Sequence, residues 1–302
     1  MTRLVDRACG RYSGAALVAA IWLVGLAPLS PAYAGAVAIT ECGQFLQGGK
    51  GILMNDLDCP VLGVQLQSGR LDLNGFTITA VNTGVSCEPS CKIIGPGTIT
   101  GASTGAVASQ LSSEANGIAR MRISDGVVLT GNVVGVIVGG RNFQGDPIGT
   151  LTLKDSEVSG NSDSGVVTNR RIKMIRSVVS GNGGDGVGGR DEGLDFNLAE
   201  SVTAKDSEIS GNAGWGVRAI ERGKLVRTVV QNNGIHGAFG EFRLSKVTLA
   251  GNGTDPSCGV TQTCADVASG TDPKIDNVTT CETSYDSTSG FPGTDWAICS
   301  LD

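Results

Sequence analysis

A short phrase recurs along this chain, and its spacing is the feature that most constrains the fold. The phrase reads Ser-Glu-Val-Ser-Gly-Asn at 156–161 and Ser-Val-Val-Ser-Gly-Asn at 177–182. The short spacings between copies are about 21 residues and the long ones about 30. A period of this size indicates a solenoid, whose units bury their hydrophobic faces only by stacking on one another. The aligned apolar positions are Ile78, Ile99, Leu129, Val158, Val179, Ile209, Val230 and Leu249.

Each unit is predicted to form short strands rather than helices. The chain has 46 glycines in 302 residues, and each glycine inside a helix costs about 1 kcal/mol relative to alanine. No unit contains a helical hydrophobic period, and the L-x-x-L-x-L pattern of leucine-rich repeats is absent. We therefore expect coils stacked as parallel sheets and joined by right-handed crossovers.

The phrase S-x-x-V-S-G-N-x-x-x-G-V, over about residues 50–280, resembles the repeats of right-handed parallel β-helix proteins of the pectate lyase-like superfamily, of the secreted bacterial type. The resemblance implies an all-β, right-handed parallel β-helix of about eight or nine coils with disulfide-stapled terminal caps. It also implies action on polysaccharides, although one fold can carry many functions.

The N-terminal segment 1–34 has the features of a secretory signal peptide. Arg3, Arg7 and Arg11 precede an apolar stretch, and a small-x-small pattern ends at Ala34, which predicts cleavage there. A membrane anchor is the alternative, but Pro28 interrupts the apolar run. We expect a secreted or periplasmic protein with no stable membrane span after signal removal. The predicted division is a signal peptide at 1–34, an N-terminal cap at 35–60, coils at 61–257 and a C-terminal coil and cap at 258–302.

Charge narrows the class of partner. The net charge is −6, and loss of segment 1–34, with three arginines and one aspartate, makes it −8. Such a chain is a poor nucleic-acid binder, and it repels polyanions unless basic residues cluster or a cation intervenes. We expect a monomer whose partner is a polysaccharide or a cell-surface glycan.

Eight cysteines remain after residue 34, and an even number in an exported chain predicts disulfides. The number alone allows 105 pairings. Proximity in the sequence favours the pairs Cys42–Cys59, Cys87–Cys91, Cys258–Cys264 and Cys281–Cys299.

Six aligned asparagines are predicted to form a structural ladder rather than a binding site, because stacked amides bond to one another and to turn backbone. They are Asn132, Asn161, Asn182, Asn212, Asn233 and Asn252. His236 is the only histidine, which argues against multi-histidine metal sites and triad hydrolysis.

The candidate site lies where the long units carry insertions, roughly at 107–117, 139–150 and 188–203. Insertions at one register emerge on one face of a solenoid, so the last two are expected to wall a cleft. Its floor is formed by residues 168–171. The predicted substrate-binding residues are Asn169, Arg170, Arg171, Arg190, Trp215, Arg218, Glu221 and Arg222.

Two chemistries are consistent with this cleft. Arginines offer planar donors to the carboxylates of an acidic glycan, and Arg170, Arg171 and Arg190 are the catalytic candidates for a lyase-like proton abstraction. No cofactor is required by the sequence, but Ca²⁺ is a candidate ligand of Asp191, Glu192 and Asp195.

Two function classes remain open. The first is a secreted β-helix that binds a polysaccharide, with uronate-containing polymers among the candidates, and processes it as a lyase, epimerase or hydrolase. The second is a non-catalytic extracellular or envelope β-solenoid with a structural or adhesive role. Convergent carboxylates and arginines on one face favour the first class, and a flat face without convergent groups favours the second.

Overall fold

The computed structural model describes residues 35–109, 118–139, 149–188, 199–255, 267–269, 274–275, 280 and 284–286. The chain divides into two compact units, Met1–Tyr33 and Ala34–Asp302. The expected signal peptide therefore lies outside the described residues, and everything below concerns the second unit. Its described residues form strands and turns, and no helix among them is long and apolar enough to cross a bilayer.

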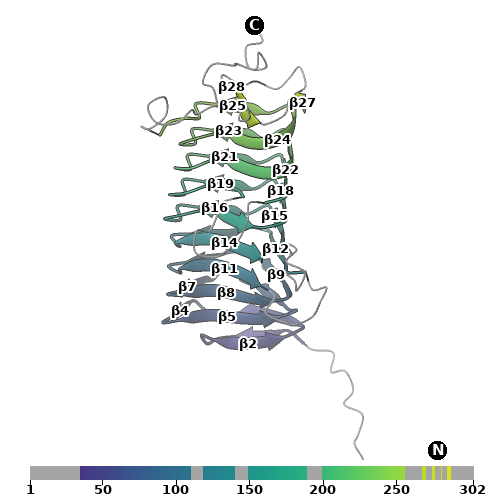
Figure 1. Cartoon of the computed structure of the whole chain (residues 1–302). Coiled ribbons are helices and arrows are strands. Elements are labelled where there is room, and N and C mark those ends of the chain that lie inside the picture. The colour runs from purple at the N-terminus through teal and green to yellow at the C-terminus, as the bar shows by residue number, and fades with distance from the viewer. Residues whose placement is uncertain are drawn as a thin grey trace, which may run out of the picture. The chain divides into compact units, whose positions relative to one another are not determined.

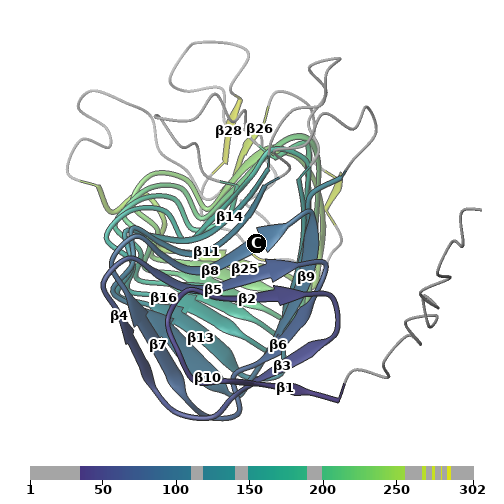
Figure 2. The same ribbon diagram turned by 90° about the horizontal axis from the view of Figure 1, so that it is seen from below.

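Three parallel sheets stack along the second unit (Figures 1 and 2). Sheet 1 contains β1 (Val37–Ile39), β3 (Lys50–Leu53), β6 (Arg70–Asp72), β9 (Ser90–Ile94), β12 (Arg120–Ser124), β15 (Thr150–Lys154), β18 (Arg171–Ile175), β20 (Ser201–Lys205), β22 (Val217–Val226), β24 (Ala238–Ser245), β26 (Val267–Ser269), β27 (Lys274–Ile275) and β28 (Ser284–Asp286). Sheet 2 contains β4 (Leu57–Cys59), β7 (Thr77–Ala80), β10 (Gly97–Thr100), β13 (Val127–Thr130), β16 (Glu157–Ser159), β19 (Val178–Ser180), β21 (Glu208–Ser210), β23 (Val229–Gln231) and β25 (Thr248–Ala250). Sheet 3 contains β2 (Gln44–Gln47), β5 (Leu62–Gln67), β8 (Thr83–Glu88), β11 (Thr104–Ser109), β14 (Val134–Gly139) and β17 (Val166–Thr168).

The chain visits the three sheets in turn and then begins the next coil. Strands β9, β10 and β11 form one coil, and the chain returns to sheet 1 at β12, which pairs in parallel with β9. Sheet 2 receives one strand per coil and has nine described strands. The prediction of a right-handed parallel β-helix of this size is confirmed. The segment 35–60 already supplies β1 to β4 to these sheets, and the division into caps and coils stays a prediction.

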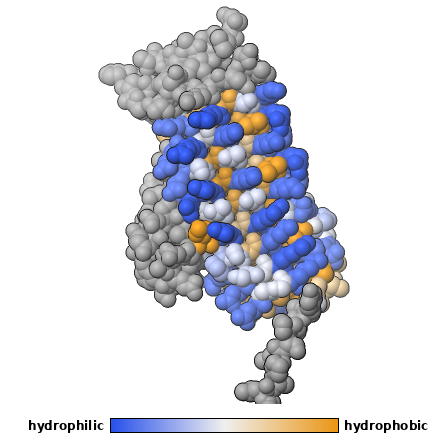
Figure 3. Space-filling model, turned by 90° about the vertical axis from the view of Figure 1, so that its right-hand side faces the viewer, coloured by the Kyte–Doolittle hydropathy of each residue, from blue (hydrophilic) through white to orange (hydrophobic). Residues whose placement is uncertain are grey.

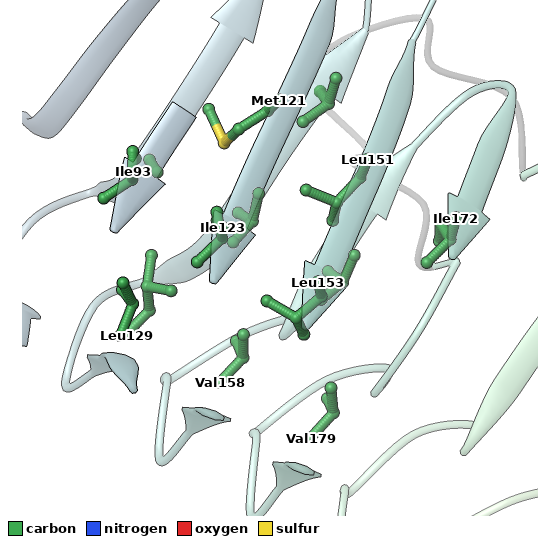
Figure 4. Packing of buried hydrophobic residues seen from close by; sticks show 14 of the residues in the cluster. Ile93, Met121, Ile123, Leu129, Leu151, Leu153, Val158, Ile172 and Val179 are labelled. Carbon is green, nitrogen blue, oxygen red and sulfur yellow. The ribbon is translucent and has the colours of Figure 1, made fainter. Parts of the chain in front are cut away.

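The core is a set of aliphatic columns that run along the stack. Ile78, Ile99, Leu129, Val158 and Val179 are register partners from coil to coil, and each is 0% exposed. Figure 4 shows such residues of sheets 1 and 2 turned toward one another between the strands. Each buried side chain of this kind contributes about 1.5–3 kcal/mol to folding. The aligned apolar residues of the repeat therefore form one common core.

The predicted asparagine ladder is confirmed and continuous. Each side-chain amide donates to the side-chain oxygen of the asparagine one coil further on, as Asn161 Nδ2 does to Asn182 Oδ1 at 2.8 Å. The same amides also donate to a backbone carbonyl, such as that of Leu129. The ladder runs from Asn132 to Asn252.

A column of glycines lies beside the asparagines and explains the repeated Gly-Val. A Cβ on Gly165 would lie 2.9 Å from the carbonyl oxygen of Gly186, and one on Gly186 would lie 2.7 Å from that of Gly216. Real Cβ atoms essentially never lie so close to a backbone atom, so any side chain here would force adjacent coils apart. Glycine is required at this register by close packing of the coils.

Two of the four predicted disulfides are confirmed. Cys42–Cys59 and Cys87–Cys91 have Cα–Cα distances of 5.4 and 5.7 Å, which suit a disulfide. The pairs Cys258–Cys264 and Cys281–Cys299 lie outside the described residues, so they stay predictions.

Candidate functional site

The outer surface of sheet 1 carries many lysine, arginine, serine and threonine side chains. Side chains along a strand point alternately to the two sides of a sheet. In β18, Ile172 and Met174 are buried in the core, whereas Arg171 and Lys173 are exposed. The same alternation in the neighbouring strands aligns the exposed residues into columns along the stack.

The first column carries a cation in most coils. Successive register partners place one of its residues in each strand of sheet 1 from β3 to β24. Neighbouring strands are about 4.8 Å apart, so these side chains lie one above another. The column consists of Lys50, Arg70, Lys92, Arg122, Thr152, Lys173, Thr203, Lys224 and Arg243.

A second column lies two residues earlier in each strand, on the same side of the sheet. It consists of Ser90, Arg120, Thr150, Arg171, Ser201 and Arg222. We call the two columns together the basic face. Figure 3 looks onto the side of the molecule that carries β12 to β24 and shows hydrophilic side chains in successive rows across it.

The positive charges of the basic face are largely unneutralised. Lys50 is an exception, because its Nζ lies 3.0 Å from Asp72 Oδ2. No described residue forms an ion pair with the other lysines and arginines of the two columns. The pKa of Lys92 is lowered by partial desolvation and then by the charges of Arg122 and Arg70. A bound anion would relieve this repulsion.

Two hollows lie on the basic face. The larger has a volume of about 680 Å³ and is lined by Arg171, Arg222 and Lys224, with the exposed carboxylates of Glu221 and Glu241 also at its surface. The smaller has a volume of about 320 Å³ and lies over β9, β12 and β15, where its lining includes cations of both columns. The basic face therefore has two concave regions as well as its positive charge.

The structure separates the sequence-predicted residues into two groups. Arg171, Glu221 and Arg222 lie together around the larger hollow. Arg170 lies just before β18, where its Nε is 3.9 Å from Glu200 Oε2. Asn169 is 2% exposed, and its Oδ1 accepts a hydrogen bond from the backbone N–H of Gly149 at 3.0 Å. The Asn169 side chain thus contributes to the backbone arrangement of the coil.

Trp215 and Arg218 belong to a separate packed cluster. The guanidinium carbon of Arg218 lies 3.3 Å from the centroid of a Trp215 ring, and Arg218 Nη1 is 3.3 Å from Asp185 Oδ2. The indole also contacts Phe239, with ring centroids 4.6 Å apart, and buried His236, with centroids 5.7 Å apart. Trp215 is thus already stacked on protein side chains.

The remaining candidates lie outside the described residues. They are Arg190 and the Ca²⁺ candidates Asp191, Glu192 and Asp195, together with most of the two insertions expected to wall the cleft. In the part of the chain that the structure describes, no three His, Cys, Asp or Glu residues are grouped so that they could hold a metal ion.

The sequence interpretation missed the basic face, although a signal for it is present. In six coils a basic residue of the first column directly precedes an inward apolar residue of sheet 1, as in Arg122-Ile123 and Lys173-Met174. The other examples are Arg70-Leu71, Lys92-Ile93, Lys224-Leu225 and Arg243-Leu244. Aligning the repeats on their apolar residues places these cations in one column.

Comparisons with known proteins add likenesses of fold. No family model and no curated protein matches the sequence. Among solved structures, the A-module of Azotobacter vinelandii mannuronan C-5 epimerase AlgE6 matches with a TM-score of 0.44 and 14% identity over 78% of this chain and 71% of that one. The AlgE4 A-module matches with a TM-score of 0.42 and 14% identity, covering 70% of each chain.

Pectate lyase Pel9A matches with a TM-score of 0.35 and 12% identity over 80% of this chain and 77% of that one. At this level of identity the matches leave the activity of this chain open. The assignment to the right-handed parallel β-helix fold rests on the strand order and register described above.

Proposed function

We propose that this protein is an extracytoplasmic β-helix that binds an acidic polysaccharide along its basic face. The observation that carries the proposal is the pair of columns whose cations, apart from Lys50, form no ion pair with a described residue, on a chain whose net charge is −6. A net negative charge repels polyanions at long range, but clustered cations create a locally positive potential. Clustered cations, which an acidic chain needs in order to bind a polyanion, are therefore present on the outer surface of sheet 1.

The chemistry of the face suits sugar carboxylates. Guanidinium groups bind carboxylates through two parallel hydrogen bonds, and Arg120, Arg171 and Arg222 supply them at the edge of the two hollows. Half-buried Thr152 and Thr203 place hydroxyls between the cations, where sugar hydroxyls find partners. Neither column contains an aromatic side chain on which a nucleic-acid base could stack.

The location follows from the disulfides. Cys42–Cys59 and Cys87–Cys91 support an oxidising compartment, because such bonds rarely persist in the cytosol. The predicted signal peptide at 1–34 would provide the export route.

Binding is tested by calorimetric titration of the mature protein with a linear polyuronate, a neutral glucan and duplex DNA. We expect binding to the polyuronate alone, weakening as salt screens the cations. Replacing Lys173 and Lys224 by Gln should weaken it roughly tenfold. The charge-retaining K173R/K224R variant and K246Q, in the turn after β24, serve as controls.

The outcome also separates the two function classes. Equal binding of DNA and polyuronate, or an unchanged affinity of the K173Q/K224Q variant, contradicts the proposal. Uronate lyases and epimerases require a proton acceptor beside cations that stabilise the carboxylate, and Glu221 and Glu241 border the larger hollow with Arg222. Ultraviolet absorbance of unsaturated products and solvent-deuterium incorporation in the same mixtures detect such chemistry. Binding without either signal identifies a non-catalytic binding or adhesion protein.

A further inference from the structure

Over five adjacent strands of the basic face, cations alternate with hydroxyls from one coil to the next. Across these five strands, β12, β15, β18, β20 and β22, the residues that the two columns of the basic face contribute to each strand belong to one chemical class. We call the basic pairs cation rungs and the others hydroxyl rungs. The cation rungs are Arg120/Arg122, Arg171/Lys173 and Arg222/Lys224, and the hydroxyl rungs between them are Thr150/Thr152 and Ser201/Thr203.

This alternation gives the face a period of two coils. Strands in a sheet are about 4.8 Å apart, so successive cation rungs are about 10 Å apart along the stack. The side chains of the cation rungs are exposed, whereas the hydroxyl rungs are half-buried. The surface is therefore a series of cationic ridges separated by shallow polar recesses.

Avoiding repulsion between like charges does not by itself explain the pattern. Like charges directly opposite one another on adjacent strands are unfavourable, and alternation within each column removes that contact. Alternation within each column does not determine whether the two columns are basic in the same strands or in different ones. Here both columns are basic in the same strands, so each ridge offers two cations about 7 Å apart, which can hold one anionic group between them.

The pattern recurs along the chain at an interval of two coils. Arg120, Arg171 and Arg222 are each 51 residues apart, which is one long and one short unit of the repeat. Between copies the residues change within a chemical class, as from Arg122 to Lys173 and from Thr150 to Ser201.

Buried positions of the same strands change more in size. Leu153 of β15 corresponds to Ala204 of β20, 51 residues later. Between these coils the outer positions thus keep their chemical class, whereas core positions differ in size.

The lysines that follow the hydroxyl rungs have a different role. Lys154 Nζ lies 3.4 Å from Asp155 Oδ2. The pKa of the Asp206 carboxyl is lowered mainly by its hydrogen bond from Arg227 and to a smaller extent by the charge of Lys205. Both lysines therefore lie beside acidic turn residues, whereas the cation rungs have no ion-pair partner among the described residues.

From this spacing we infer that the ligand is a linear glycan with an alternating acidic–neutral disaccharide repeat, carrying one carboxylate per two sugars. The inference rests on the proposed function and specifies its substrate class. An extended pyranose residue advances by close to one coil spacing, so a disaccharide matches one period. Each cation rung binds a carboxylate, and each hydroxyl rung faces a neutral sugar. A homopolymer of uronate would place half of its carboxylates out of reach of the cation rungs.

A length series tests the match in the wild-type protein. Three cation rungs can hold three carboxylates, so affinity for alternating oligosaccharides should rise on the order of tenfold from disaccharide to tetrasaccharide and again to hexasaccharide. Beyond the hexasaccharide the increase should be small. A uronate homopolymer of equal length should bind more weakly than the alternating one. Affinity that instead follows the number of charges, with the homopolymer binding tighter, overturns the inference and leaves polyanion binding intact.

A charge-neutral rearrangement tests the phase. The variant R171S/K173T/S201R/T203K moves the middle cation rung by one coil without changing the net charge. It should lose at least tenfold in affinity for the alternating hexasaccharide and change little toward the homopolymer. Circular dichroism and the melting temperature establish that it folds, and if it does not, the length series decides alone. Equal losses for both polymers contradict the inference, and wild-type protein that binds neither polymer rejects the proposed function as well.

Discussion

At the scale of single residues, the asparagine ladder is the least replaceable feature. Asn182 donates to Asn212 Oδ1 and to the Val158 carbonyl, and its own Oδ1 accepts from both the backbone and side-chain N–H groups of Asn161. It is 1% exposed. Losing this amide removes four hydrogen bonds that join three coils, among them the bond that the Asn161 backbone N–H donates.

Replacing Asn182 by Ala should therefore lower the free energy of unfolding by about 1–3 kcal/mol. Urea denaturation followed by circular dichroism measures the change. Asn82→Ala, at an exposed position in the turn before β8, is the matched control and should be nearly neutral. An N182A protein as stable as the control would show that the ladder does not stabilise the coils.

The ladder was predictable from the sequence because its residues occupy one position of a repeated phrase. The partners of Trp215 were not, since the indole, Arg218 and Asp185 meet only when two adjacent coils stack in register. Likewise Asn169, expected on a cleft floor, follows β17 directly and is buried against Gly149. Sequence position alone does not say which side of a coil a loop residue faces.

At the scale of elements, the turns from sheet 1 to sheet 2 carry their own charge ladder. Asp155, Arg176, Asp206 and Arg227 have left-handed φ angles of 50°, 46°, 53° and 47°. Arg176 binds Asp155 through two hydrogen bonds, of 2.6 and 2.9 Å, and Arg227 binds Asp206 in the same way. Paired side chains thus lie over turns whose backbone conformation suits glycine better.

These pairs predict a loss of stability in acid. The hydrogen bonds from Arg176 and Arg227 hold the pKa values of Asp155 and Asp206 below the ordinary 3.8. Their contribution is present above the ordinary value and is lost as the pH falls through the lowered ones. Melting temperatures measured from pH 6 down to about 2 should therefore fall more steeply for wild type than for D155N/D206N. Parallel curves for the two proteins would contradict this assignment.

The basic face is also a feature of the strands as elements. It was not predicted from the sequence because it is visible only when the register of the strands is known. The short and long units differ by about nine residues, and a slip of one residue would turn a column from solvent to core. The sequence argument therefore concentrated on the insertions, which lie largely outside the described residues. The repeated basic-apolar pairs fix the register once they are aligned on the core residues Ile123, Met174 and Leu225.

At the scale of the whole second unit, the two described disulfides lie in its N-terminal coils. Cys42–Cys59 spans 17 residues and joins the turn before β2 to the end of β4, whereas Cys87–Cys91 spans four and joins β8 to β9. In the stack of coils, β1, β2 and β4 end the order of their sheets. Open strand edges of this kind fray unless they are held.

Removing the longer cross-link should cost more stability than removing the shorter. Loop-closure entropy gives about 3 kcal/mol for C42S/C59S and about 2 kcal/mol for C87S/C91S. Urea unfolding of the two double variants beside the wild type measures both. The opposite order, with C87S/C91S the less stable variant, would show that the short bridge stabilises the folded core around strands β8 and β9 rather than constraining the unfolded chain.

The 51-residue offset makes a pair of coils, rather than a single coil, the natural unit of growth. In the proposed complex, gaining or losing one such block would change the number of sugar residues bound and would keep the spacing of the cation rungs matched to the disaccharide repeat. Gaining a single coil would break this match between the cation rungs and the carboxylates. The length of the binding face would therefore change in steps of two coils.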